Sequence, residues 1–128
     1  MGIRRVVLAI GLSIGSTAAQ GHAQDADPAA GQNTFVIRCS QCHDITAGVN
    51  KSGPTLKGVV GRTAGTAPDY PYSDAMRAAG FVWGEEQFKA YLVAPKTVVP
   101  KNKMNFNGIK RPGELEPLVA YLMVAGAP

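Results

Sequence analysis

Five consecutive residues, Cys39-Ser40-Gln41-Cys42-His43, constrain the fold of this 128-residue chain more than any other feature. The sequence contains no other cysteine and only one other histidine. On a helical turn, residues three apart lie on one face. The motif therefore offers two thiols and one imidazole from a single turn of backbone.

These three groups have the arrangement that attaches haem c. Both thiols can add to the two vinyl groups along one haem edge, and the adjacent imidazole then points at the iron. A thioredoxin-like pair would need a βαβ setting that the sequence does not show, and zinc would need further cysteine or histidine ligands. A disulfide would close a very small ring and would leave His43 without a role. The motif predicts one covalently bound haem c, with His43 on the iron.

The first 23 residues have the pattern of a secretory signal peptide. Arg4 and Arg5 precede an apolar stretch over 6–14, and small residues follow over 15–19. The apolar part is far shorter than the roughly 20 residues that a membrane-spanning helix needs. We therefore expect export to the periplasm without stable membrane insertion.

The remaining chain has the length of one domain. We expect cleavage after Ala23, or alternatively after Ala19. The prediction divides the rest into a short linker, 24–30, and a domain, 31–128. A domain of this size gains only modest stability from its hydrophobic core, and a large apolar cofactor would supplement it.

Helical patterns separated by long irregular segments predict an all-α domain. The expected helices are 27–38, 73–79, 84–94 and a last one that ends near Met123. The last helix begins either at Pro112 or only at Pro117, because a proline inside a helix costs about 3 kcal/mol. Glycines and prolines punctuate the long loop that follows His43, and a second loop is expected over 95–108. A long loop in a small domain is typical of a segment that wraps a functional group.

The sixth iron ligand can be approached by elimination. Cleavage after Ala23 removes His22, so the mature chain cannot form a bis-histidine haem. The remaining soft ligands are Met76, Met104 and Met123. Met76 and Met123 fall in predicted helices, where methionine is more often core filler. Met104 lies in a polar loop and is the favoured ligand.

Beyond the motif, the chain resembles class I c-type cytochromes, particularly the mitochondrial-type branch with its bacterial periplasmic relatives. The likeness covers nearly the whole mature domain in order and spacing. The matching positions are Gly31, Phe35, Gly53-Pro54, Leu56, Gly61-Arg62-Thr63, Tyr72, Trp83, Tyr91-Leu92, Pro95, Pro100, Lys103-Met104, Phe106, Leu118 and Tyr121-Leu122. The resemblance implies the class I cytochrome c fold, with helices and large loops wrapped around one covalently attached haem.

The resemblance also implies roles for residues around that haem. His43 and Met104 would be its axial ligands, the Pro54 carbonyl would accept a hydrogen bond from His43 Nδ1, and Tyr91 would hydrogen-bond near the Met104 sulfur. The other cofactor-binding residues would be Arg62, Tyr72 and Trp83, which would satisfy a propionate, and Phe106. Met76 departs from the family, which often has a polar Asn there, and this predicts altered distal hydration and a shifted reduction potential.

Two protein ligands leave the iron no open position for substrate, which favours an electron carrier over an enzyme. Removal of Arg4 and Arg5 lowers the formal charge from +4 to +2 (11 basic minus 9 acidic residues), and with export this argues against nucleic-acid binding. By the resemblance, six basic residues surround the exposed haem edge and would dock acidic faces of redox partners. They are Arg38, Lys51, Lys96, Lys103, Lys110 and Arg111.

Three functions remain open at this point. The first is a monomeric, freely diffusing periplasmic carrier between a respiratory donor complex and an oxidase or another acceptor. The second is a dedicated cytochrome subunit or electron acceptor of one periplasmic dehydrogenase. The third is a haem peroxidase or gas-binding protein, which would need Met104 off the iron.

Overall fold

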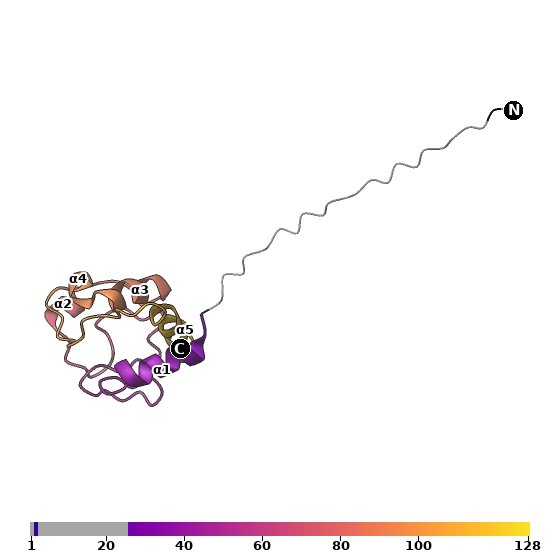
Figure 1. Cartoon of the computed structure of the whole chain (residues 1–128). Helices are drawn as coiled ribbons and strands as arrows, with labels where there is room; N and C mark the ends of the chain where they lie inside the picture. Colours follow the sequence, from indigo (N-terminus) through magenta and orange to yellow (C-terminus); the bar gives the residue numbers. More distant parts are fainter. Residues whose placement is uncertain (1, 3–25) are drawn as a thin grey trace.

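The structure is a computed structural model that describes residue 2 and residues 26–128 (Figure 1). Apart from Gly2, the predicted signal peptide and both cleavage sites lie outside the described residues. The helices of the described part are α1 (Pro28–Arg38), α2 (Asp74–Arg77), α3 (Glu85–Val93), α4 (Pro95–Val98) and α5 (Leu115–Ala125). Over residues 26–128 there is no strand, only the isolated bridges His43–Asn50 and Thr63–Val82. The predicted all-α class is confirmed.

Helix α1 delivers the cysteine motif. Asp27 caps it, because its Oδ1 accepts a hydrogen bond of 2.9 Å from the Ala29 amide, and Pro28 occupies the first helical position. Residues 28–30, which the domain division assigned to the linker, belong to the predicted helix 27–38 and form its first turn. The backbone then turns once more, since His43 N donates to Cys39 O at 2.9 Å. This extra turn brings both cysteines and His43 to one end of α1.

Helices α1 and α5 cross in close contact (Figure 1). At the crossing a Cβ on Gly31 would lie 1.8 Å from the Pro117 carbonyl oxygen, so only glycine fits. The rings of Phe35 and Tyr121 meet at 5.4 Å beside it. The pairing places the motif at the end of α1 against a fixed support.

Three boundaries differ from the prediction. Helix α5 begins at Leu115, and Pro117 is its third residue, where a missing N–H costs no intrahelical bond. The predicted loop over 95–108 begins with the short helix α4, in which Pro95 takes the first position. Helix α2 ends at Arg77 rather than Ala79, because Ala79 N donates to the nearer carbonyl of Met76 and tightens the last turn.

Two hydrophobic clusters form the core. The larger joins α1, α3 and α5 with the long loop, through Phe35, Ile45, Val59, Phe88, Leu92, Ile109, Leu118, Val119 and Leu122. The smaller comprises Ala64, Met76, Tyr91 and Val99, with Met104 packed against it. Among the helices of residues 26–128, none is long and apolar enough to cross a membrane.

Candidate functional site

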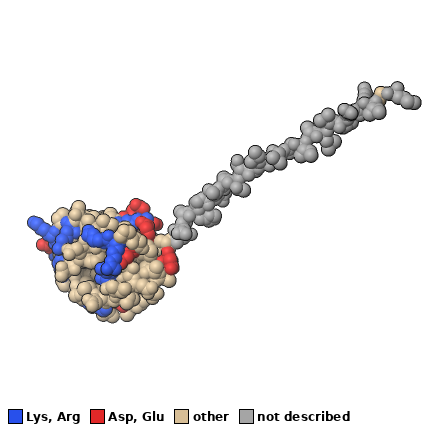
Figure 2. Space-filling view, viewed as in Figure 1, with Lys and Arg blue, Asp and Glu red and all other residues tan. Residues whose placement is uncertain are grey.

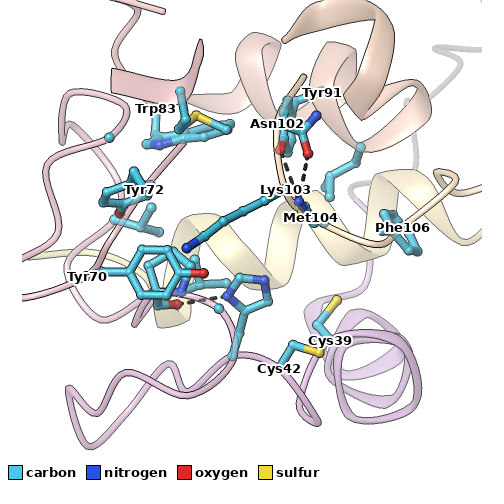
Figure 3. A pocket seen from close by; sticks show the side chains of 18 of the residues that line it. Cys39, Cys42, Tyr70, Tyr72, Trp83, Tyr91, Asn102, Lys103, Met104 and Phe106 are labelled. Atoms are coloured by element: carbon cyan, nitrogen blue, oxygen red, sulfur yellow. Dashed lines mark hydrogen bonds between the residues drawn. The ribbon is translucent and has the colours of Figure 1, made fainter. Parts of the chain in front are cut away.

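A cavity of about 280 Å³ is lined by residues of both clusters. Cys39, Cys42 and His43 reach it from the turn after α1, and Met104 reaches it from the segment after α4. Figure 3 shows both cysteine side chains beside this helix end and Met104 on another ribbon across from them. The structure thus brings together the four residues on which the sequence prediction depends.

The two cysteines are not joined in a disulfide, and they lie in different surroundings. Burial raises the pKa of the Cys39 thiol to about 11, although the charge of Arg38 opposes the rise. Cys42 is exposed at the mouth of the turn. The half-buried Cys39 and the exposed Cys42 thus reach the same cavity from one turn of backbone.

His43 is held in one tautomer. Its Nδ1 lies 2.8 Å from the carbonyl oxygen of Pro54, which can only accept, so Nδ1 carries the proton and Nε2 keeps its lone pair. Burial lowers the pKa of the imidazole, more than the bond to Pro54 raises it. Gly53 lies directly against the ring. His43 thus has a fixed orientation and an unprotonated Nε2.

Met104 is held at two points. The Tyr91 hydroxyl donates to its Sδ at 3.6 Å, and its backbone N–H donates to Asn102 Oδ1 at 2.9 Å. Tyr91 is buried, which raises the pKa of its hydroxyl to about 12, so it remains a donor at any ordinary pH. In Figure 3 Tyr91 and Asn102 lie together beside Met104. Asn102 was not among the predicted site residues. The signal for it is local, because asparagine side chains in turns often accept a hydrogen bond from the backbone two residues further on, which here is Met104.

The remaining predicted cofactor residues, Arg62, Tyr72, Trp83 and Phe106, all line the cavity. The Arg62 guanidinium also donates to the carbonyls of Lys57 at 3.0 Å and Thr55 at 2.8 Å. The Tyr72 hydroxyl accepts from the Ala67 amide at 3.2 Å. One edge of the cavity therefore carries a cation and a hydroxyl, as an anionic group would require.

Tyr70 is a further lining residue that the sequence prediction missed. Its hydroxyl donates to the Ser52 carbonyl at 2.7 Å, and the Lys103 ammonium lies 4.6 Å from its ring centre. Lys103 also donates to the Pro71 carbonyl. Figure 3 shows the Lys103 side chain extended from the Met104 segment towards Tyr70. Lys103 thereby connects two loops at the cavity.

Most of the predicted docking cations have partners within the chain. Arg38 and Arg111 share Glu114, at 3.2 and 3.7 Å. Lys51 donates to the Ser40 carbonyl, and Lys110 donates to that of Val93 at 3.0 Å. Lys96 is exposed on α4. Figure 2 shows several Lys and Arg side chains gathered on the visible face, with acidic side chains among them.

These residues fit a covalent haem. Two thiols share one side of a mainly apolar cavity, a neutral imidazole nitrogen and a thioether are both directed to it, and a cation and a hydroxyl stand at another edge. Over residues 26–128 no group of three His, Cys, Asp or Glu side chains is placed to hold a metal ion. The cysteine pair, the apolar lining and the polar edge together fit a covalently bound haem.

Comparison with known proteins agrees with this site. The family model described as cytochrome c matches residues 28–125. The chain therefore belongs to the cytochrome c family, as a class I c-type cytochrome that binds one covalent haem c and transfers electrons rather than acting as an enzyme. The predicted family, fold, cofactor and non-enzymatic role are confirmed.

The chain aligns with most of the length of individual relatives. The chain is 47% identical over 107 residues to cytochrome c2 of Agrobacterium tumefaciens (strain II Chrys), which covers 80% of this chain and 96% of that protein. It is 43% identical over 98 residues to cytochrome c of Sesamum indicum, covering 76% and 88%. It is 44% identical over 102 residues to cytochrome c of Chlamydomonas reinhardtii, covering 79% and 91%.

Proposed function

We propose that this chain is a soluble, monomeric, periplasmic one-electron carrier whose haem iron is ligated by His43 and Met104. It would move electrons between a respiratory donor complex and an oxidase or another acceptor. The observation that carries the proposal is the pair of oriented ligands at one cavity: His43 held by Pro54 at 2.8 Å, and Met104 held by Tyr91 at 3.6 Å. With both axial positions occupied, substrate has no place on the iron.

When bound, the haem supplies a reversible one-electron iron couple. The chain's own residues set the conditions for that couple. The Pro54 carbonyl increases the basicity of His43, while the Tyr91 O–H directs its positive end at the Met104 sulfur and reduces the sulfur's donation. The apolar lining disfavours additional positive charge. The last two effects favour the reduced form, which suits a carrier that delivers electrons to a strong oxidant.

The periplasmic location rests on two supports. The amino-terminal residues have the charge and hydropathy pattern of an export signal. A bacterial cytochrome c2 is 47% identical to this chain over 107 residues.

The proposed docking face consists of Arg38, Lys51, Lys96, Lys103, Lys110 and Arg111. Carbonyl partners hold the ammonium groups of Lys51, Lys103 and Lys110 without cancelling their charge. Glu114 neutralises only part of the charge of Arg38 and Arg111. The face thus keeps a net positive charge on positioned side chains, which would steer an acidic partner into a brief, salt-sensitive contact.

The ligand assignment is tested by the ferric spectrum. We expect the sulfur-to-iron charge-transfer band of His/Met ligation in the holoprotein, and we expect Met104→Ala to abolish it. Met76→Ala and Met123→Ala are the matched controls and should retain it. A band that survives Met104→Ala would overturn the assignment.

The carrier role is tested by salt. The rate of electron transfer to an acidic redox partner should fall steeply as ionic strength rises, because screening weakens the attraction of the basic face. A rate independent of salt, together with stoichiometric co-purification with one dehydrogenase, would instead identify the chain as a dedicated subunit.

A further inference from the structure

The segment that leads from α4 to Met104 makes a tight turn at Val99-Pro100-Lys101-Asn102. Asn102 N donates to Val99 O at 3.2 Å, which closes the turn. Pro100 occupies its second position, and Lys101, at its third position, has φ of +64°. A left-handed conformation at this position normally calls for glycine, because a side chain makes it strained. Lys101 therefore places backbone strain three residues before Met104.

The side chain of Asn102 holds this strained segment on α4. Its Nδ2 donates to the carbonyls of Pro95 at 3.0 Å and Val99 at 2.8 Å. Its Oδ1 accepts the backbone N–H of Met104 at 2.9 Å. The side-chain amide thus donates to the first residue of α4 and to the residue that follows α4, while its oxygen accepts from Met104.

Asn102 is attached to a part of the chain that is packed into the core. Pro95 and Val99 are both buried, and Val99 belongs to the cluster against which Met104 packs. Tyr91 of α3, by contrast, holds only the Met104 sulfur. The backbone of Met104 and its thioether are therefore positioned by two independent side chains.

We propose that Asn102 is the positioning residue for Met104, and that its three hydrogen bonds keep the thioether in place against competing ligands. The inference rests on the proposed ligation by His43 and Met104. Asn102 acts through the backbone of the loop and itself touches neither sulfur nor iron in this role. Its loss should weaken Met104 ligation more than it weakens the rest of the fold.

Exogenous imidazole, titrated into the ferric holoprotein, measures how readily Met104 is displaced. Asn102→Leu is close in shape and removes all three bonds, and we expect imidazole affinity to rise at least tenfold. Asn102→Asp keeps an acceptor for Met104 N–H but faces two carbonyls with a carboxylate, and we expect a rise of severalfold. If Asn102→Leu does not fold, Asn102→Asp carries the test alone.

Two controls separate positioning from charge and from general destabilisation. Asn107→Asp makes the same charge change at an exposed position of the same segment. Asp27→Ala removes the cap of α1, far along the chain from Met104. We expect imidazole affinity within twofold of wild type for both controls. Hydrogen exchange adds an independent readout, because the Met104 amide should lose protection in Asn102→Leu and keep it in Asp27→Ala.

The proposal is overturned if both Asn102 variants bind imidazole within twofold of wild type, or if Asp27→Ala raises the affinity as much as Asn102→Leu does. Failure of the underlying ligand assignment has a different signature. In that case the wild-type holoprotein lacks the sulfur-to-iron band, or Met104→Ala retains it.

Discussion

Gly53 offers a direct test of how His43 is oriented. A Cβ at this position would lie 2.5 Å from Cε1 and 2.8 Å from Nδ1 of the His43 ring, and 2.9 Å from the Cys42 carbonyl oxygen. The backbone of Gly53 does not need positive φ, so the conflict in Gly53→Ala is purely steric. The ring cannot move away freely, because its Nδ1 is bonded to Pro54 O at 2.8 Å.

The magnitude follows from these contacts. Ordinary carbon contacts are about 3.5–4.0 Å, so the ring or the backbone must shift by about 1 Å. Overpacking of this kind costs about 1–3 kcal/mol, and loss of the His43–Pro54 hydrogen bond adds about 1 kcal/mol. We therefore expect Gly53→Ala to lower the free energy of unfolding by about 2–4 kcal/mol, a large part of the about 5–15 kcal/mol typical of a domain.

Denaturant unfolding of the holoprotein and redox titration measure the two consequences. The matched control is Gly84→Ala, where an added Cβ meets nothing within 4 Å and only the preference for glycine over alanine at the α3 cap is lost. The control should lose at most about 1 kcal/mol and keep its reduction potential. If Gly53→Ala matched the control in both measurements, the inference that Gly53 fixes the imidazole would be refuted.

Three further changes have defined outcomes. Tyr91→Phe removes the O–H donor to Met104 and should lower the reduction potential in a redox titration while costing less than about 1 kcal/mol of stability; an unchanged potential would contradict the role of this bond. Asp44 accepts the Gly48 amide at 2.7 Å, and although desolvation raises the pKa of its carboxyl, backbone N–H donors outweigh this and hold it below the usual range. The stabilisation by Asp44 is therefore present above the unfolded pKa of about 3.9 and is lost as pH falls through the lower folded value. The difference in free energy of unfolding between wild type and Asp44→Asn should thus disappear in acid. A difference that stays constant with pH would refute this role of Asp44. Lys101→Gly relieves φ of +64° and should raise the free energy of unfolding by up to about 1 kcal/mol in denaturant without altering the sulfur-to-iron band; a loss of stability would show that the turn is unstrained.

The parts of the fold that the sequence predicted depend on neighbours a few residues apart. The start of α1 follows from Asp27 and Pro28, which cap it locally. Ser73 caps α2 in the same way, because its side chain accepts from the Met76 amide, whereas Gly84 begins α3 without a side-chain cap. The place of Pro117 within α5 is harder to predict, because the cost of a proline depends on where the helix begins. Here the helix begins at Leu115, and Pro117 packs against Gly31 of α1.

The charged residues show the limit of sequence reasoning. The predicted docking face includes Arg38 and Arg111, yet both pair with Glu114, which lies 76 positions from Arg38 in the chain. Such a pair exists only because α1 and the segment before α5 meet in space. The sequence shows which charged residues are present, but it does not show which of them form pairs in the folded chain.

The sequence by itself determined the covalent chemistry of this protein, because two cysteines three apart and an adjacent histidine need only one turn of backbone to act together. Collinear matches over the domain extended this to a class I cytochrome c. The resemblance implied that Pro54 holds His43 and that Tyr91 holds Met104; the tertiary structure gave both contacts their geometry and added Asn102, which the sequence did not single out. Pro54 lies 11 positions from His43 and Tyr91 lies 13 from Met104, so only the folded chain brings these pairs together; Asn102 is two positions from Met104, but it reaches Pro95 only through the fold of α4.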